Sequence, residues 1–113
     1  MRVTIYHNPK CSNSRPCLEI IREEGFEATI VEYLKFPPSR SELEKLIGKM
    51  GVSAREVIRI RESVYSELGL ATADEPALLK AIAAHPIVLN RPIVVTDKGA
   101  KLCRPPDLVR ELL

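Results

Sequence analysis

The chain has 113 residues, 45% of them hydrophobic and 28% charged, which is the composition of one globular domain covering residues 1–113. The net charge is only +2, from 17 basic and 15 acidic residues, and Lys and Arg form no run, so direct binding of nucleic acid is not supported. No apolar run approaches the ~20 residues of a membrane span, and no signal peptide precedes Val3. We therefore expect a cytoplasmic protein with reduced thiols and no membrane partner.

The first third of the chain is predicted to form a strand, a helix and a second strand. Val3–His7 indicates a short buried strand, and apolar residues at helical spacing follow it. Gly25 is typical of the position just beyond a helix C-terminus. Ala28–Leu34 then returns to strand character. The short connections favour a right-handed crossover that leaves the two strands parallel in one sheet.

The middle of the chain is predicted to contain three helices. The first two begin with capping-box patterns, Ser39 with Glu42 and Ser53 with Glu56. Pro76 suits the first turn of the third helix. This block is expected as a helical insertion between the second and third strands.

The last third is predicted to form a β-hairpin and a terminal helix. Strands are expected at Pro92–Thr96 and Ala100–Cys103, joined by a turn at Asp97–Gly99. Pro105 or Pro106 would open the helix that ends the chain. The fold class is therefore α/β, with a four-stranded mixed sheet whose first two strands are parallel and whose last two form the hairpin.

One cysteine stands where the first strand gives way to the first helix. Cys11 lies within the segment His7–Arg15, beside free helix N-terminal amides and cationic side chains. Such surroundings lower a thiol pKa from about 8.5, and a fall of roughly two units makes the thiolate the major form at pH 7. The segment therefore indicates a thiol nucleophile, whereas a cysteine without these neighbours could equally be an inert buried thiol.

Cys11 lacks the partners of two familiar thiol motifs. A tyrosine-phosphatase-like loop requires Arg six residues after the cysteine, where this chain has Cys17. A thioredoxin-type dithiol requires a second cysteine at position 14, which is Ser14. Cys17 lies too far along a helix to form a disulfide with Cys11, so the reductant should come from outside. Cys17 and Cys103 are expected as core thiols, although a resolving role for Cys103 stays open.

A set of short motifs follows the same order along the whole chain as in one known family. The motifs are Tyr6-His7-Asn8-Pro9-Lys10-Cys11, Tyr33-Leu34 before Pro37-Pro38, Arg55 to Arg59, Tyr65 with Glu67-Leu68-Gly69-Leu70, His85-Pro86-Ile87, Asn90-Arg91-Pro92-Ile93 and Leu102-Cys103-Arg104-Pro105. Together they resemble the glutaredoxin-linked arsenate reductase family. This resemblance implies a thioredoxin-like fold with a helical insertion and a cis peptide bond before Pro92.

The resemblance also implies roles for residues near the thiol. Cys11 would be the catalytic nucleophile, and His7 would be the second catalytic residue because it helps to set the ionisation of Cys11. A positively charged His7 would lower the pKa of the thiol. Ser14 is placed with the substrate-binding residues, where it would support the loop.

Three arginines are implied as oxyanion ligands: Arg59, Arg91 and Arg104. A planar guanidinium can offer two parallel donors to adjacent oxygens of a tetrahedral anion such as arsenate. The choice of Arg59 over Arg55 and Arg61, which flank it, rests on the resemblance alone.

The implied activity is reduction of arsenate to arsenite through a covalent cysteine–arsenic adduct, with glutathione as co-substrate and glutaredoxin as protein partner. Two histidines and three scattered cysteines lack the spacing of a zinc site, so we expect no metal ion and no bound cofactor. Two alternatives stay open: a glutathione-dependent thiol reductase acting on another substrate, and an Spx-like regulator that binds RNA polymerase. Spx-type proteins usually carry Cys-x-x-Cys, which Ser14 interrupts here.

Overall fold

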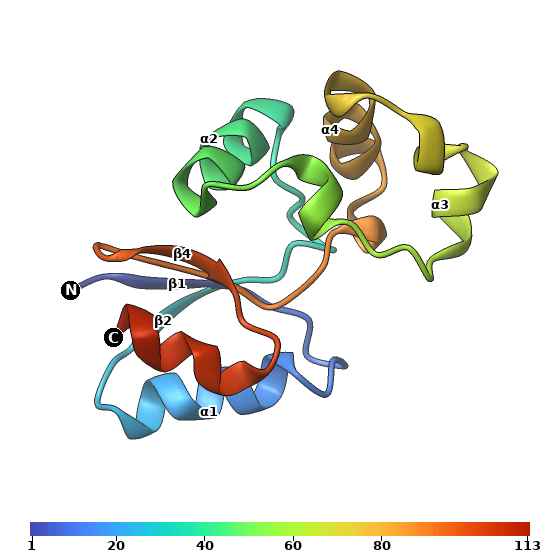
Figure 1. Ribbon diagram of the computed structural model, residues 1–113. Helices are drawn as coiled ribbons and strands as arrows, with labels where there is room; N and C mark the ends of the chain where they lie inside the picture. The colour runs from blue at the N-terminus through green and yellow to red at the C-terminus, as the bar shows by residue number, and fades with distance from the viewer. The chain divides into compact units, whose positions relative to one another are not determined.

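The computed structural model describes residues 1–113, and its internal contacts divide the chain into two compact units (Figure 1). The first unit comprises Met1–Phe36 and Arg91–Leu113, and the second comprises Pro37–Asn90. None of the helices combines the length and apolar character that crossing a membrane would require. The single domain over residues 1–113 stays a prediction.

The first unit contains the whole sheet. Its strands are β1 (Val3–Tyr6), β2 (Ala28–Val31), β3 (Ile93–Thr96) and β4 (Gly99–Leu102), in the spatial order β2-β1-β3-β4. β1 pairs with β2 in parallel and with β3 antiparallel, and β3 and β4 form an antiparallel hairpin. The predicted α/β class and the four-stranded mixed sheet are confirmed.

Alternation along β1 places alternate side chains against the core. Val3 and Ile5 are fully buried, whereas Thr4 between them is only partly buried. Ile5 lies opposite Ile30 of β2 on one side and Val94 of β3 on the other. The register therefore fixes a row of apolar residues across the centre of the sheet.

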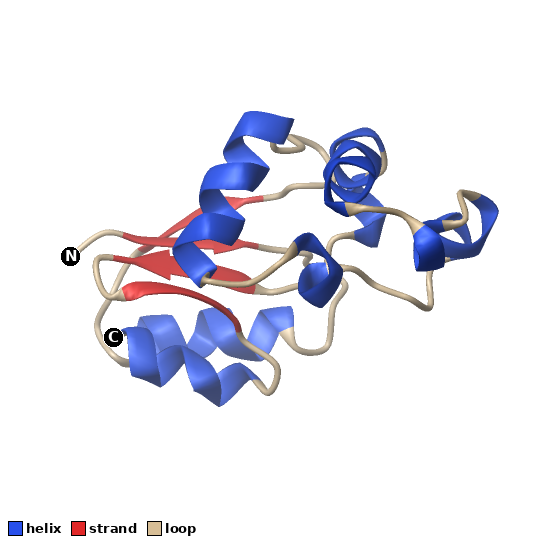
Figure 2. Cartoon of the chain, turned by 45° about the horizontal axis from the view of Figure 1, so that its top comes forward, coloured by secondary structure: helices blue, strands red, loops and turns tan.

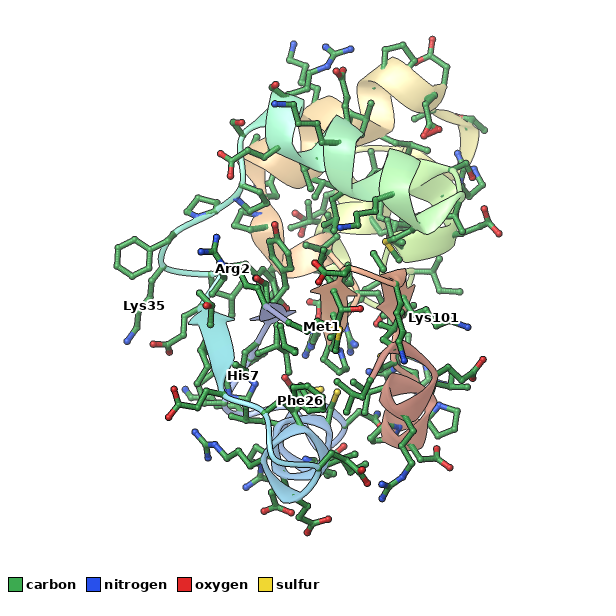
Figure 3. The ribbon with its side chains drawn as sticks, turned by 90° about the vertical axis from the view of Figure 1, so that its left-hand side faces the viewer. Met1, Arg2, His7, Phe26, Lys35 and Lys101 are labelled. Atoms are coloured by element: carbon green, nitrogen blue, oxygen red, sulfur yellow. The ribbon has the colours of Figure 1, made fainter.

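Two helices cover one face of this sheet, α1 (Ser14–Glu23) and the 3₁₀ helix η4 (Pro106–Leu112), side by side in Figures 1 and 2. Between them and the strands lies a cluster of buried residues: Val3, Ile5, Cys17, Leu18, Ile21, Val94, Cys103, Val109 and Leu112. The side chain of Phe26, labelled in Figure 3, packs against this cluster. Burial of each large aliphatic side chain stabilises the unit by about 1.5–3 kcal/mol.

The end of α1 follows the predicted glycine. Gly25 has φ +87°, a left-handed conformation that glycine adopts without a Cβ clash. The N–H of Gly25 donates to the Arg22 carbonyl at 3.0 Å, and the N–H of Phe26 donates to the Ile21 carbonyl at 3.1 Å. These two bonds satisfy carbonyls at the helix C-terminus, and they confirm Gly25 as the residue that ends the helix.

The second unit is helical. Its elements are α2 (Arg40–Met50), η1 (Ala54–Val57), α3 (Ser63–Glu67), η2 (Leu70–Thr72), α4 (Glu75–Ala84) and η3 (Pro86–Val88). Ser39 and Glu42 form the predicted capping box, since the Glu42 N–H donates to the Ser39 hydroxyl at 3.1 Å and the Ser39 N–H donates to the Glu42 carboxylate at 3.3 Å. At the start of α4, Asp74 accepts the Ala77 N–H at 3.0 Å.

The second predicted helix is only one turn long. After η1, the backbone at Ile58 becomes extended and pairs with Leu89 in an isolated antiparallel bridge. The Arg59 N–H donates to the Val88 carbonyl at 2.7 Å instead of to the preceding turn. This long-range pairing ends the helix. The helix α3 was not predicted. It is five residues long and none of its residues is buried.

The second strand is also shorter than predicted. It ends at Val31 rather than Leu34, because the N–H groups of Lys35 and Phe36 both donate to the Glu32 carbonyl and turn the chain. Lys35 projects outward beyond this turn in Figure 3. The peptide bond before Pro92 is cis, as the resemblance implied, and so is the bond before Pro105.

Candidate active site

Cys11 lies in the loop between β1 and α1, within the first unit. The loop folds back on itself, since the Cys11 N–H donates to the Asn8 carbonyl at 3.0 Å. The Cys11 carbonyl in turn accepts the Arg15 N–H at 3.3 Å, which joins the loop to the first turn of α1. Cys11 is 7% exposed. The thiol is therefore held at the N-terminal end of a ten-residue helix.

The surroundings of Cys11 favour the thiolate. Burial by itself would raise the pKa of the Cys11 thiol, but hydrogen bonds from the backbone N–H groups of Asn13 and Ser14 and from the Arg91 side chain outweigh it. The positive charge of Arg91 acts in the same direction. The net result is a pKa below the ordinary thiol value, which is the property a nucleophilic cysteine needs.

Arg91 and Arg104 reach the cysteine from the two ends of the hairpin. Arg91 precedes β3 and Arg104 follows β4, and the pairing of Ile93 with Leu102 brings both to the same end of the sheet. Arg104 Nη1 lies 3.9 Å from Cys11 Sγ and donates to the Arg91 carbonyl at 2.9 Å. The contact to sulfur is long, and the lowered pKa of Cys11 derives chiefly from the N–H groups of Asn13 and Ser14 and from Arg91.

His7, Asn8 and Ser14 form a buried polar network beneath the loop. Ser14 is completely buried, and its hydroxyl lies 2.6 Å from His7 Nδ1. The same hydroxyl accepts the Asn8 N–H at 3.2 Å. The Ser14 side chain is thus engaged inside the loop rather than presented to solvent, and only its backbone N–H reaches Cys11.

His7 differs from the expectation of a positive charge. Burial lowers the pKa of His7 below its ordinary value of 6.5, with Glu32 opposing this effect and Arg22 adding to it. A neutral His7 can accept the Ser14 hydroxyl proton at Nδ1 while Ser14 accepts from Asn8. Burial and the contact with Ser14 thus favour a neutral His7 that fixes the loop, in place of the positive charge expected from the sequence.

The other two cysteines are core thiols, as expected. Cys17 and Cys103 are both 0% exposed, and all three cysteines are free. A hydrogen bond with Cys17, followed by burial, raises the pKa of Cys103. Strand alternation continues past β4, so that Cys103 faces the core while Arg104 is exposed. No group of three or more His, Cys, Asp or Glu side chains is arranged to hold a metal ion.

Arg59 lies in the second unit, and its neighbours distinguish it from Arg55. The Arg55 side chain donates to the carbonyls of Leu70 at 3.1 Å and Ala73 at 2.8 Å, so it links two backbone segments. Arg59 instead forms an ion pair with Glu62, with 3.3 Å between Nε and Oε1. The sequence carries no signal for this difference, because the acceptors of Arg55 are backbone carbonyls 15 and 18 residues away.

The sheet order, the helical insertion and the loop cysteine define a protein of the thioredoxin-like fold with a single thiol at its first strand-to-helix join. The model of the ArsC family matches residues 6–112. The chain belongs to the ArsC family.

Curated relatives and a solved structure are similar over nearly the whole chain. An arsenate reductase of Escherichia coli (strain K12) is 50% identical over 113 residues, which cover 98% of this chain and 80% of that protein. An arsenate reductase of Rhizobium meliloti (strain 1021) is 49% identical over 115 residues, covering 100% of this chain and 82% of that protein. The structure of an arsenate reductase from Vibrio cholerae has a TM-score of 0.96 at 40% identity and covers 100% of this chain and 98% of its own.

Proposed function

We propose that the protein reduces arsenate to arsenite in the cytoplasm, with Cys11 as the nucleophile. The observation that carries this proposal is the setting of one loop thiol, whose lowered pKa comes from two backbone N–H groups and Arg91. Arg104 adds a second guanidinium 3.9 Å from the sulfur. A thiolate beside two guanidinium groups suits attack on an anionic, tetrahedral substrate. The names of relatives about half identical to the chain support the same substrate.

The first step forms a sulfur–arsenic bond. The Cys11 thiolate attacks arsenic(V), an arsenic–oxygen bond breaks, and the leaving oxygen departs as water after taking up protons. Arsenic keeps its oxidation state in this step. Negative charge on the remaining oxygens is stabilised by fixed guanidinium groups, an electrostatic effect that is often the largest contribution to catalysis.

The second step reduces arsenic and needs an external thiol. Glutathione sulfur joins Cys11 sulfur in a mixed disulfide, and the electron pair of the sulfur–arsenic bond stays on arsenic, which leaves as arsenite. A glutaredoxin thiolate then takes the glutathione moiety and restores the Cys11 thiol. An external donor is favoured because Cys17 and Cys103 are fully buried in the core.

The substrate-binding residues in this proposal are Arg91, Arg104 and Arg59, while His7 and Ser14 hold the loop. Arg91 and Arg104 are proposed on their positions beside the thiol. Arg59 is proposed on the family resemblance and on the donors that its ion pair leaves unused. Loss of any one of the three should weaken arsenate binding without unfolding the protein.

Arsenite release by the purified protein with arsenate, glutathione and glutaredoxin tests the proposal. Cys11→Ser should abolish turnover, whereas Cys17→Ala, which also removes one thiol, should retain it once its thermal stability has been checked. Arsenite formation by Cys11→Ser at the wild-type rate would exclude Cys11 as the nucleophile. An inactive wild type with every donor present would exclude arsenate as the substrate.

A further inference from the structure

The guanidinium of Arg59 has side-chain partners at two of its three nitrogens. Arg59 Nε donates to Glu62 Oε1 at 3.3 Å, and Nη1 donates to Asn90 Oδ1 at 3.5 Å. The side chains of Arg59 and Glu62 are 21% and 27% exposed. Neither of these two bonds uses Nη2. Nη2 carries two N–H donors that can bind oxygens of an anion.

Backbone hydrogen bonds fix the segments that carry Arg59, Glu62 and Asn90. The Arg59 N–H donates to the Val88 carbonyl at 2.7 Å, and the Asn90 N–H donates to the Val57 carbonyl at 2.7 Å, so the segment around Arg59 is tied to the segment that carries Asn90. The Glu62 N–H donates back to the Arg59 carbonyl at 3.3 Å. This turn brings the Glu62 carboxylate to the Nε side of the arginine.

We propose that Glu62 is a positioning residue for oxyanion binding, which orients Arg59 so that its Nη2 group stays available. The inference rests on the proposed role of Arg59 as a substrate ligand. A long arginine side chain loses considerable rotational freedom when it binds a ligand, and fixing it beforehand removes part of that cost. Glu62 leaves Nη2 to the anion, because its carboxylate accepts from Nε.

Removal of the Glu62 carboxylate should weaken arsenate binding, because Arg59 would no longer be fixed before the anion binds. Glu62→Ala should raise the KM for arsenate about fivefold, equivalent to about 1 kcal/mol, with kcat changed less than about twofold. Glu62→Gln keeps an oxygen that accepts from Nε, and it should restore most of the wild-type KM. Glu67→Ala removes an exposed carboxylate from α3, the helix that follows Glu62, and should leave KM unchanged.

Binding without turnover gives a second readout. In the Cys11→Ser background, calorimetric titration with arsenate should show the Kd raised by Glu62→Ala to the same extent as the KM. In the Arg59→Ala background, Glu62→Ala should have no further effect on KM or Kd, because the residue on which it acts is gone.

The outcomes separate this inference from the proposed function. An inactive wild type, or an Arg59→Ala variant with unchanged KM, would overturn the proposed role of Arg59 and with it that of Glu62. An impaired Arg59→Ala variant beside an unaffected Glu62→Ala variant would overturn the role of Glu62 alone. A lower KM in Glu62→Ala would do so as well, since it would mean that Glu62 competes with the anion.

Discussion

Arg104 Nη1 donates to the Arg91 carbonyl at 2.9 Å and lies 3.9 Å from Cys11 Sγ. The backbone of one arginine thus positions the side chain of the other. The side chain of Arg91 acts directly on the sulfur as a hydrogen-bond donor and a positive charge. The two arginines therefore contact the sulfur differently, and we expect their variants to change the pKa of Cys11 by different amounts.

Arg91→Ala should raise the pKa of Cys11, because it removes both the hydrogen bond and the charge that favour the thiolate. The rate of Cys11 alkylation as a function of pH measures this, with the midpoint of the profile moving to higher pH. Arg104→Ala should move the midpoint less, since its contact with the sulfur is long, at 3.9 Å. An equal shift in both variants would contradict the larger effect of Arg91 on the pKa of Cys11.

Ser14→Ala should destabilise the protein by about 1–3 kcal/mol, because it leaves the buried Asn8 N–H and His7 Nδ1 without their shared partner. Urea unfolding measures the change in the free energy of unfolding. Ser12→Ala, an exposed position of the same loop, should change it by less than about 0.5 kcal/mol. Equal stability of the two variants would mean that the network does not hold the loop.

Stability should fall with decreasing pH through a contribution from His7. The folded pKa of His7 lies below its ordinary value of 6.5, so below that pH the unfolded state binds more protons than the folded state and the free energy of unfolding drops. The drop should continue down to the folded pKa. Unfolding measured at intervals between about pH 5 and 7.5 should show a shallower dependence for His7→Asn than for wild type. Parallel curves would argue against a neutral buried His7.

Arg55→Ala and Arg59→Ala should separate stability from binding. Arg55 donates to the carbonyls of Leu70 and Ala73, so its loss should lower the free energy of unfolding and leave the KM for arsenate near the wild-type value. Arg59→Ala should lower kcat/KM for arsenate by about 10–100-fold, the range expected for a lost charge-assisted hydrogen bond. Steady-state kinetics and urea unfolding of both variants provide the comparison, and the reverse pattern would exchange the two roles.

Alkylation of the native protein should modify one cysteine out of three. Cys17 and Cys103 are completely buried, and the raised pKa of Cys103 disfavours its reactive form. Mass spectrometry should find one modified thiol in buffer and three in denaturant. Modification of more than one thiol in the folded protein would show that the core thiols are accessible.

Features governed by near neighbours could be predicted from the sequence. Gly25, Ser39 and Pro76 act on the residues beside them, and the helices begin or end where these residues indicated. The alternation of Cys103 and Arg104 is equally local, and it leaves Cys103 in the core, where it was expected, and Arg104 exposed.

Features governed by distant partners could not be predicted. The segment after Val57 has helical character in sequence, yet it pairs with the backbone near Leu89, more than thirty residues away. The burial that lowers the pKa of His7 could not be predicted either, because the sequence does not show how much water remains around a histidine. The engagement of Arg55 with carbonyls of Leu70 and Ala73 is of the same kind.

Cys103 in the core is followed directly by Arg104, whose side chain lies near Cys11. A larger side chain at position 103 would press on Cys17 and displace the backbone from which the next residue extends. Such a substitution would loosen the guanidinium beside the thiol even though it never touches a substrate. A change at this buried position is therefore expected to alter the position of Arg104 as well as the packing of the core.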